Sequence, residues 1–273
     1  MNAKELIKAG RLKEARSQLI EAVKTSPADS SNRTLLFQVL LFCGEWEKAR
    51  GHLDILASQS IEQEAAAQIY HNLIQAEIER LGFFKNDIQP SFLPQSPPYA
   101  EIYQRAIRNI AEKKFEAAGE VFAQIESDRP NISGTLNGKP FSGFRETDTR
   151  LLYFLEAFVH ERYVLLPYES LRELTVSAPQ TLFDLLWAPA QITTWEGLAL
   201  NCFLPVIYNE SFLHEDDQMK LGRSTDWVAL GGGFFKGVGQ HVFEIGNDEV
   251  ALLEIREVIF NPSDVEINDD RQS

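Results

Sequence analysis

The chain has 273 residues, of which 44% are hydrophobic and 24% charged, as in a folded globular protein rather than a disordered one. Its net charge of −14 makes nucleic acid and anionic membranes poor partners, because an acidic surface repels phosphate groups. The charge is uneven: residues 1–129 carry 16 Lys and Arg against 18 Asp and Glu, whereas residues 130–273 carry 10 against 22.

Neither a signal peptide nor a membrane-spanning segment is predicted. The N-terminus is charged, and no run approaches the roughly 18 uninterrupted apolar residues of a membrane helix. The two cysteines, Cys43 and Cys202, lie far apart, which favours reduced, buried thiols over a disulfide. We therefore predict a cytoplasmic protein without membrane insertion. The acidity of the second half either maintains solubility or attracts a basic partner.

A motif in the first half recurs at an offset of 34 residues, the period of tetratricopeptide repeats. Gly-Arg-Leu-Lys-Glu-Ala at residues 10–15 returns as Gly-Glu-Trp-Glu-Lys-Ala at 44–49, and the same spacing is met again at 113–118. Each glycine suits a helix end because it accepts the left-handed conformation, and the large apolar residue two positions later opens the next helix. Residues 1–129 are predicted to form a TPR-like α-helical repeat domain.

The third step of this spacing falls on Phe83 and finds no match. The prolines that follow rule out a regular helix there, so a Pro-rich loop is predicted over residues 83–98. We expect this loop to pack its apolar residues back onto the helices: Phe83, Phe84, Phe92 and Leu93. Stacked helix pairs curve and offer a concave groove for an amphipathic helix or an extended peptide. Alternatively, the helices only support the second half.

After Pro130 the pattern changes to short strand-like runs separated by turn residues. Residues 130–273 are predicted to form a mostly β domain, a curled sheet or partial barrel with short helices. The expected strands are 151–159, 162–167, 171–176, 190–195, 198–204, 227–230, 240–245 and 250–255, with a helical stripe at 181–187. The tail from about residue 261 is acidic and poor in apolar residues, and is predicted to be frayed.

No catalytic or metal-binding motif is evident. The histidines are scattered without zinc spacing, and the acidic run at 214–217 fits a solvated loop better than an ion site. The glycines at 231–239 lack the Lys-Ser/Thr pair of a phosphate loop and suit tight turns. No catalytic, cofactor-binding or metal residues are therefore predicted.

The segment Leu-Gly-Arg-Ser-Thr-Asp-Trp at 221–227 is denser in functional groups than a generic core requires. Arg223 and Asp226 form either a substrate clamp, with His214 nearby, or an internal ion pair that pins a turn. In the second case Trp227 belongs to the core. A buried arginine usually needs a carboxylate partner, which favours the structural interpretation.

At this segment the chain resembles the ImpE/SciE family, also called TagJ, accessory proteins of bacterial type VI secretion. The resemblance runs nearly end to end. Its motifs are Phe-Cys-Gly-Glu-Trp at 42–46, Tyr-Glu-Ser-Leu-Arg at 168–172, Asp-Leu-Leu-Trp-Ala-Pro-Ala at 184–190, Phe-Leu-Pro at 203–205, the segment at 221–227, and Gly-Val-Gly-Gln at 237–240. Partner-binding or family-motif roles are accordingly predicted for five residues: Trp46, Trp187, Arg223, Asp226 and Trp227.

The resemblance implies a protein without catalytic activity or cofactor that acts with the contractile sheath. Family members associate with the small sheath subunit, TssB, and through it with ClpV, the ATPase that disassembles contracted sheath. The predicted function is an adaptor that binds a helix of that subunit. The alternatives are a general repeat scaffold for another cytosolic partner, or an enzyme with a site near Arg223 and Asp226.

Overall fold

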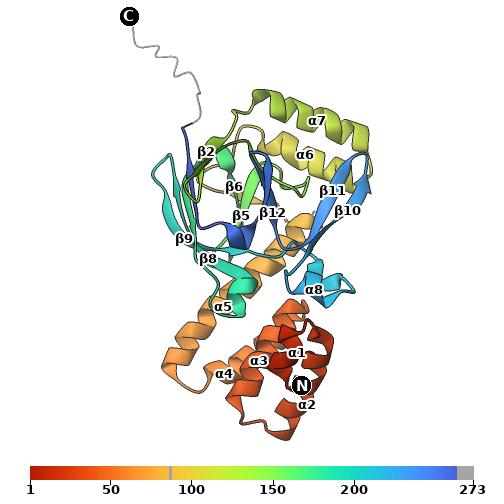
Figure 1. Ribbon diagram of the computed structural model, residues 1–273, viewed down its shortest axis with the longest axis vertical. Helices are drawn as coiled ribbons and strands as arrows, with labels where there is room; N and C mark the ends of the chain where they lie inside the picture. The colour runs from red at the N-terminus through yellow and green to blue at the C-terminus, as the bar shows by residue number, and fades with distance from the viewer. Residues whose placement is uncertain (86–87, 263–273) are drawn as a thin grey trace, which may run out of the picture.

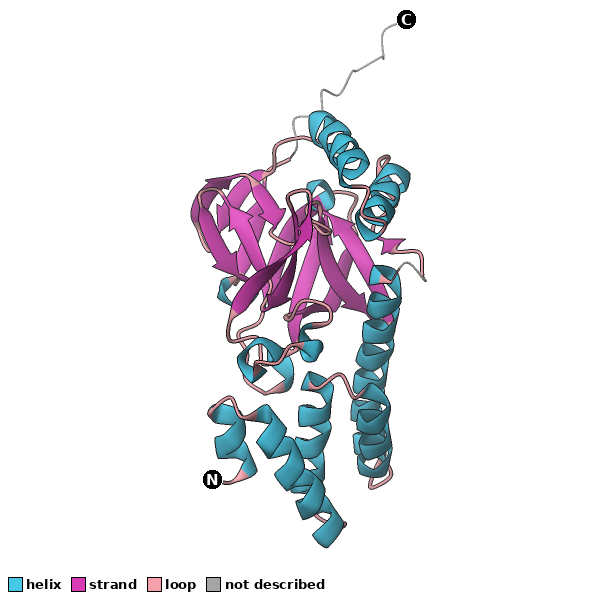
Figure 2. Cartoon of the chain, turned by 90° about the vertical axis from the view of Figure 1, so that its right-hand side faces the viewer, coloured by secondary structure: helices cyan, strands magenta, loops and turns pink. Residues whose placement is uncertain are grey.

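A computed structural model describes residues 1–85 and 88–262, and shows a helical N-terminal region followed by a mostly sheet region (Figures 1 and 2). The helices of the first region are α1 (Ala3–Lys8), α2 (Leu12–Thr25), α3 (Ser30–Phe42), α4 (Trp46–Ala57), α5 (Ile61–Phe84), α6 (Ala100–Ala111) and α7 (Phe115–Asp128). One short helix, α8 (Asp217–Lys220), lies within the sheet region.

The helices begin and end where the sequence supplies caps. Asp29 accepts hydrogen bonds from the first amides of α3, and Ser60 caps α5 in the same way. Gly10 and Gly44 follow α1 and α3 with φ of +73° and +67°, the conformation that lets the chain turn back after a helix. The predicted turns at both copies of the repeated motif are confirmed.

The largest sheet has nine strands in the order β1-β6-β5-β9-β8-β7-β14-β2-β3, and all neighbours are antiparallel except β1 and β6. Its strands are β1 (Ser91–Phe92), β2 (Ser133–Leu136), β3 (Lys139–Ser142), β5 (Phe154–Val159), β6 (Arg162–Pro167), β7 (Leu171–Val176), β8 (Trp187–Thr194), β9 (Ala199–Pro205) and β14 (Glu257–Phe260). The end strands β1 and β3 do not pair with each other, so the described strands form an open sheet and not a closed barrel.

Two smaller sheets complete the second region. Strands β4 (Phe144–Glu146), β12 (Val242–Ile245) and β13 (Asp248–Ala251) form a three-stranded sheet, and β10 (Thr225–Gly231) pairs with β11 (Phe234–Gly239). The predicted strands at 162–167 and 171–176 are confirmed, as is the hairpin of 190–204. The helical stripe at 181–187 gives only a single 3-10 turn, Phe183–Leu185, because the chain enters β8 at Trp187.

The last three helices of the first region pack on the sheet and not only on one another. The C-terminal half of α5 lies against β5 and β6, where the Phe83 ring is 5.7 Å from that of Tyr163. Helices α6 and α7 lie at the end of the sheet region far from α1–α4 (Figure 1). Tyr103 of α6 packs on Phe154 with ring centroids 4.7 Å apart. Whether residues 1–129 form one domain stays a prediction.

The predicted loop over 83–98 starts later than expected. Phe83 and Phe84 belong to the last turn of α5, and Phe92 lies in β1, 5.4 Å from the ring of Phe154. These aromatic residues pack on the sheet, so the expectation that the loop folds back onto the helices is wrong for them. The reason is the length of α5, which carries the chain to β5 and β6 before the prolines are reached.

The predicted frayed tail falls mostly on residues 263–273, which lie outside the described residues. Asn261 still donates a backbone hydrogen bond to the carbonyl of Ser133, at 2.8 Å. Within the part of the chain that is described, no helix is both long enough and apolar enough to cross a membrane.

Candidate partner-binding surfaces

The two repeat turns of the helical region face residues 207–223, which we call the docking segment. A Cβ atom on Gly10 would lie 1.9 Å from the side-chain nitrogen of Gln218, and one on Gly44 would lie 2.4 Å from the ring of Phe212. Only glycine leaves room for these contacts. The repeated glycines therefore serve two needs, the turn between helices and the close approach of the sheet region.

Polar groups of the docking segment cap the helices. Arg223 donates from Nη1 to the carbonyl oxygen of Lys8 and from Nη2 to that of Ile7, each at 2.9 Å. These carbonyls end α1, where the helix dipole favours a cation. At the start of α2, the carboxylate of Asp217 accepts a hydrogen bond from the amide of Lys13 at 2.9 Å. The N-cap residue of α2 supplies no side-chain hydrogen bond, so the cap comes from a distant part of the sequence.

The structure does not bring Arg223 and Asp226 together. Asp226 accepts a hydrogen bond from the backbone of Trp227, which is half-buried and donates from Nε1 to Thr147 at 3.0 Å. Among the described residues, no hydrogen bond or ion pair joins Arg223, Asp226 or His214 to one another. Both sequence interpretations, the substrate clamp and the internal ion pair, are therefore wrong. Arg223 instead binds carbonyls more than 200 positions earlier in the chain.

The two remaining predicted residues lie at the junction of the two regions. Trp46 opens α4 and packs edge-on against Phe212, with ring centroids 5.3 Å apart. Trp187 is buried in β8, and its indole nitrogen donates to Glu77 of α5 at 3.0 Å. These contacts hold the helical region against the sheet region. Both side chains are covered to a degree that leaves little of either ring for a partner.

A buried polar network lies beneath this junction. The guanidinium of Arg80, which is 1% exposed, donates two hydrogen bonds of 2.7 Å to the carboxylate of Glu156 and one of 2.9 Å to the carbonyl of Ile207. The ring nitrogens of His241 lie 3.1 Å from Glu156 and 2.8 Å from Glu146. The network links α5 to β5, β12 and β4, elements that lie far apart in the sequence.

The network is balanced in charge. Burial alone would lower the pKa of His241, but the two carboxylates beside it raise that pKa to about 9. Burial opposes ionisation of Glu156 as well, yet Arg80 and His241 hold the pKa of this carboxyl well below its usual range. At neutral pH, two buried cations therefore face two buried carboxylates. The imidazolium donates to both carboxylates, and the Arg80 guanidinium is its neighbour and not its donor.

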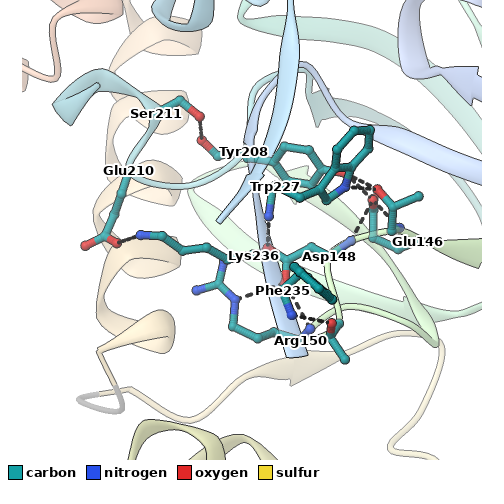
Figure 3. Close-up of polar contacts among 12 residues, drawn as sticks. Glu146, Asp148, Arg150, Tyr208, Glu210, Ser211, Trp227, Phe235 and Lys236 are labelled. Carbon is teal, nitrogen blue, oxygen red and sulfur yellow. Dashed lines mark hydrogen bonds and ion pairs between the residues drawn. The ribbon is translucent and has the colours of Figure 1, made fainter. Parts of the chain in front are cut away.

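A second group of buried contacts extends the network toward the β10–β11 hairpin (Figure 3). Asp148 is fully buried and accepts hydrogen bonds from Arg150, at 2.6 and 3.0 Å, and from the amide of Gly237, at 3.0 Å. Nearby, the hydroxyl of Tyr208 donates to Glu146 at 2.5 Å. The carboxylates of this cluster already have their donors, so the geometry supports a role in holding strands together better than proton transfer to a substrate.

The most open surface of the helical region lies between α4 and the first half of α5. It is a groove of about 530 Å³, lined by Asp54, Ala57, Ser58, Ser60, Ile61, Glu64, Ala67, Gln68 and His71. Ile61 is 83% exposed, and Ile69 on the neighbouring side of α5 is 49% exposed. Between residues 61 and 69 only Ala67 is buried. Large apolar side chains this exposed on a helix are candidates for a partner contact.

Comparison with known proteins decides the family. The chain is 35% identical to the type VI secretion system accessory component TagJ of Pseudomonas aeruginosa over 264 residues, which cover 97% of this chain and 92% of that protein. The chain belongs to the ImpE family. The ImpE family model matches residues 138–259, a range that holds four of the five predicted residues, all but Trp46.

The fold of this ImpE-family chain recurs in a solved structure. The crystal structure of protein VPA1032 from Vibrio parahaemolyticus superposes with a TM-score of 0.86, covers 95% of this chain and 97% of that one, and shares 24% sequence identity. At this identity the likeness shows the fold alone. Helical and sheet regions in this arrangement are therefore not peculiar to the present sequence.

Sequence reasoning missed the buried network. Its members are spread from residue 80 to residue 241, and no local spacing links them. A signal was nevertheless present, because Glu156 interrupts the apolar run of 151–159 and is only 4% exposed. A charge in the middle of a buried strand requires a partner of opposite charge, and that partner proved to be Arg80.

Proposed function

We propose that this chain is a non-catalytic, cytoplasmic adaptor of the bacterial type VI secretion system. In this proposal its helical region is a TPR-like repeat unit that binds a helix of the small sheath subunit, TssB. Binding that subunit links the chain to sheath turnover by ClpV. The observation that carries the proposal is the relation to TagJ, a type VI secretion accessory component, over 97% of the chain.

The geometry agrees with binding better than with catalysis. The charged groups that are buried are paired with one another, and the polar residues singled out from the sequence hold helix ends or lie at the junction of the two regions. Exposed apolar side chains, in contrast, gather on the helical region, beside the groove between α4 and α5. A groove flanked by exposed isoleucines suits the apolar face of an amphipathic helix.

The first test is a calorimetric titration of the purified protein with a peptide that carries the N-terminal helix of TssB from the same bacterium. Micromolar or tighter binding is the expected result. A peptide of the same composition in scrambled order is the control, because it keeps the charge but loses the apolar stripe. Absence of heat at high concentrations of the native peptide, with protein that gives a cooperative thermal transition, would refute the proposed partner and favour a scaffold for another protein.

A further inference from the structure

We propose that the groove between α4 and α5 is the empty place of a missing repeat helix, and that an amphipathic helix with basic flanks, supplied by the partner, occupies it. The inference rests on the proposed function and locates its binding site. It requires three observations: the absence of a third turn, the exposure of the surface that the absent helix would cover, and the charge around that surface.

The third turn is absent because the sequence lacks the glycine that would make it. One step of 34 residues from Gly44 reaches Ile78, which lies within α5. A β-branched residue enters the left-handed conformation only at high cost, so the helix does not end there. Helix α5 runs on to 24 residues, against 13 for α3. Its second half carries Arg80 and Phe83 into the sheet region instead of returning beside α5.

The absent helix leaves its would-be neighbours uncovered. In a stack of helix pairs, the helix after α5 would return along α5 beside α4 and bury the side chains between them. Here the next helix, α6, starts at Ala100 and packs on the sheet. The first three turns of α5 consequently expose Ile61, Ala65 and Ile69, which are spaced four residues apart along one side.

The shape of the groove suits a helix. Its α4 side and the turn before α5 carry only small residues, Ala57, Ser58 and Ser60, and its floor is Ala67. Small side chains let a second helix approach to the short end of the usual 8–10 Å interaxial distance. An apolar stripe on the incoming helix would then contact Ile61 from the side.

The charge of the groove identifies the chemistry of the occupant. Asp54 and Glu64 line it, and the exposed Glu62 is adjacent. The one ring in the lining, His71, has its Nε2 atom 3.2 Å from Asp54. Lys or Arg residues beside the apolar stripe of a partner helix would meet these carboxylates. A second copy of this chain is a poorer occupant, because each copy carries a net charge of −14.

The test compares variants in binding to full-length TssB by calorimetry. Ile61→Asp should weaken binding at least tenfold, and Glu64→Lys should weaken it and reduce its dependence on salt. Asp in the first turn of a helix is favoured by the dipole, so Ile61→Asp should melt like the wild type. Leu213→Asp is the matched control, because Leu213 is 68% exposed but lies in a turn beside the other end of α4. Its affinity should match the wild type.

Hydrogen exchange of the wild-type complex gives an independent measurement. Residues 54–72 should exchange more slowly when TssB is bound, and their protection should disappear with Ile61→Asp. If the wild type binds TssB and Ile61→Asp binds within twofold of it, the proposed groove is wrong while the adaptor function stands. If the wild type does not bind TssB, the adaptor function and the groove are both overturned.

Discussion

Replacing Arg80 by methionine should strongly destabilise the protein, although the substitution keeps a long, apolar side chain. The change removes the two hydrogen bonds to Glu156 and the one to the carbonyl of Ile207, and leaves a carboxylate that is 4% exposed without its main partner. Breaking a buried ion pair on one side typically costs about 3–5 kcal/mol. At roughly 2–4 °C per kcal/mol for a chain of this size, the melting temperature should fall by on the order of 10 °C.

Thermal and urea unfolding followed by tryptophan fluorescence measure this loss, since Trp187 lies at the same junction. Arg11→Met is the control, because Arg11 pairs with Glu14 on the surface and its loss should leave the melting temperature unchanged. The double variant Arg80→Met with Glu156→Leu should recover at least half of the loss, because it leaves no unpaired carboxylate there. If Arg80→Met melted within 2 °C of the wild type, the network would not hold α5 to the sheet.

Three further substitutions test other parts of the structure. The pKa of His241 is about 9, above the 6.5 of an unperturbed histidine, so its contribution to stability should be full below pH 6.5 and disappear as pH rises through 9; His241→Gln should flatten the urea midpoint over that range. Arg223→Ala should cost about 1 kcal/mol and speed amide exchange in α1, whereas Asp226→Asn should leave both unchanged. Gly44→Ala should cost more than about 1 kcal/mol in urea unfolding, because φ is positive there and a ring fills the space, while Gly51→Ala, within α4 and open to solvent, should stabilise by up to about 1 kcal/mol.

The order of elements was predictable from the sequence wherever a local rule decides the structure. Gly10 and Gly44 mark two turns because the left-handed conformation requires glycine there, and the alternating runs of 162–167 and 171–176 give strands with the predicted bounds. These signals depend only on residues close in sequence.

The arrangement of the elements in space was not predictable by the same rules. Arg223 follows a turn and looks like the partner of a nearby carboxylate, yet its ligands are the carbonyls at the end of α1. Trp46 has the features of an ordinary repeat residue but contacts Phe212 of the docking segment. In both cases the partner lies more than 160 residues away, and only the packing of the two regions brings it near.

The division of the chain at residue 129 offers a test of how far the helices depend on the sheet. A chain of residues 1–129 keeps every predicted repeat helix but removes the partners of the second half of α5 and of α6. Arg80 would lose Glu156, and Tyr103, which is fully buried, would lose the ring of Phe154. Desolvated charge and exposed aromatic surface both oppose folding of this part.

We therefore expect α1–α4 to fold in the isolated chain, and α6 and α7 to exchange their amides nearly as fast as an unfolded peptide. Hydrogen exchange by mass spectrometry distinguishes the two groups of helices within a single sample, and the full chain supplies the reference protection. Equal protection of α6, α7 and α1–α4 would show that residues 1–129 are a self-sufficient domain. Protection confined to α1–α4 would mean that α6 and α7, despite their place in the sequence, belong energetically to the sheet region.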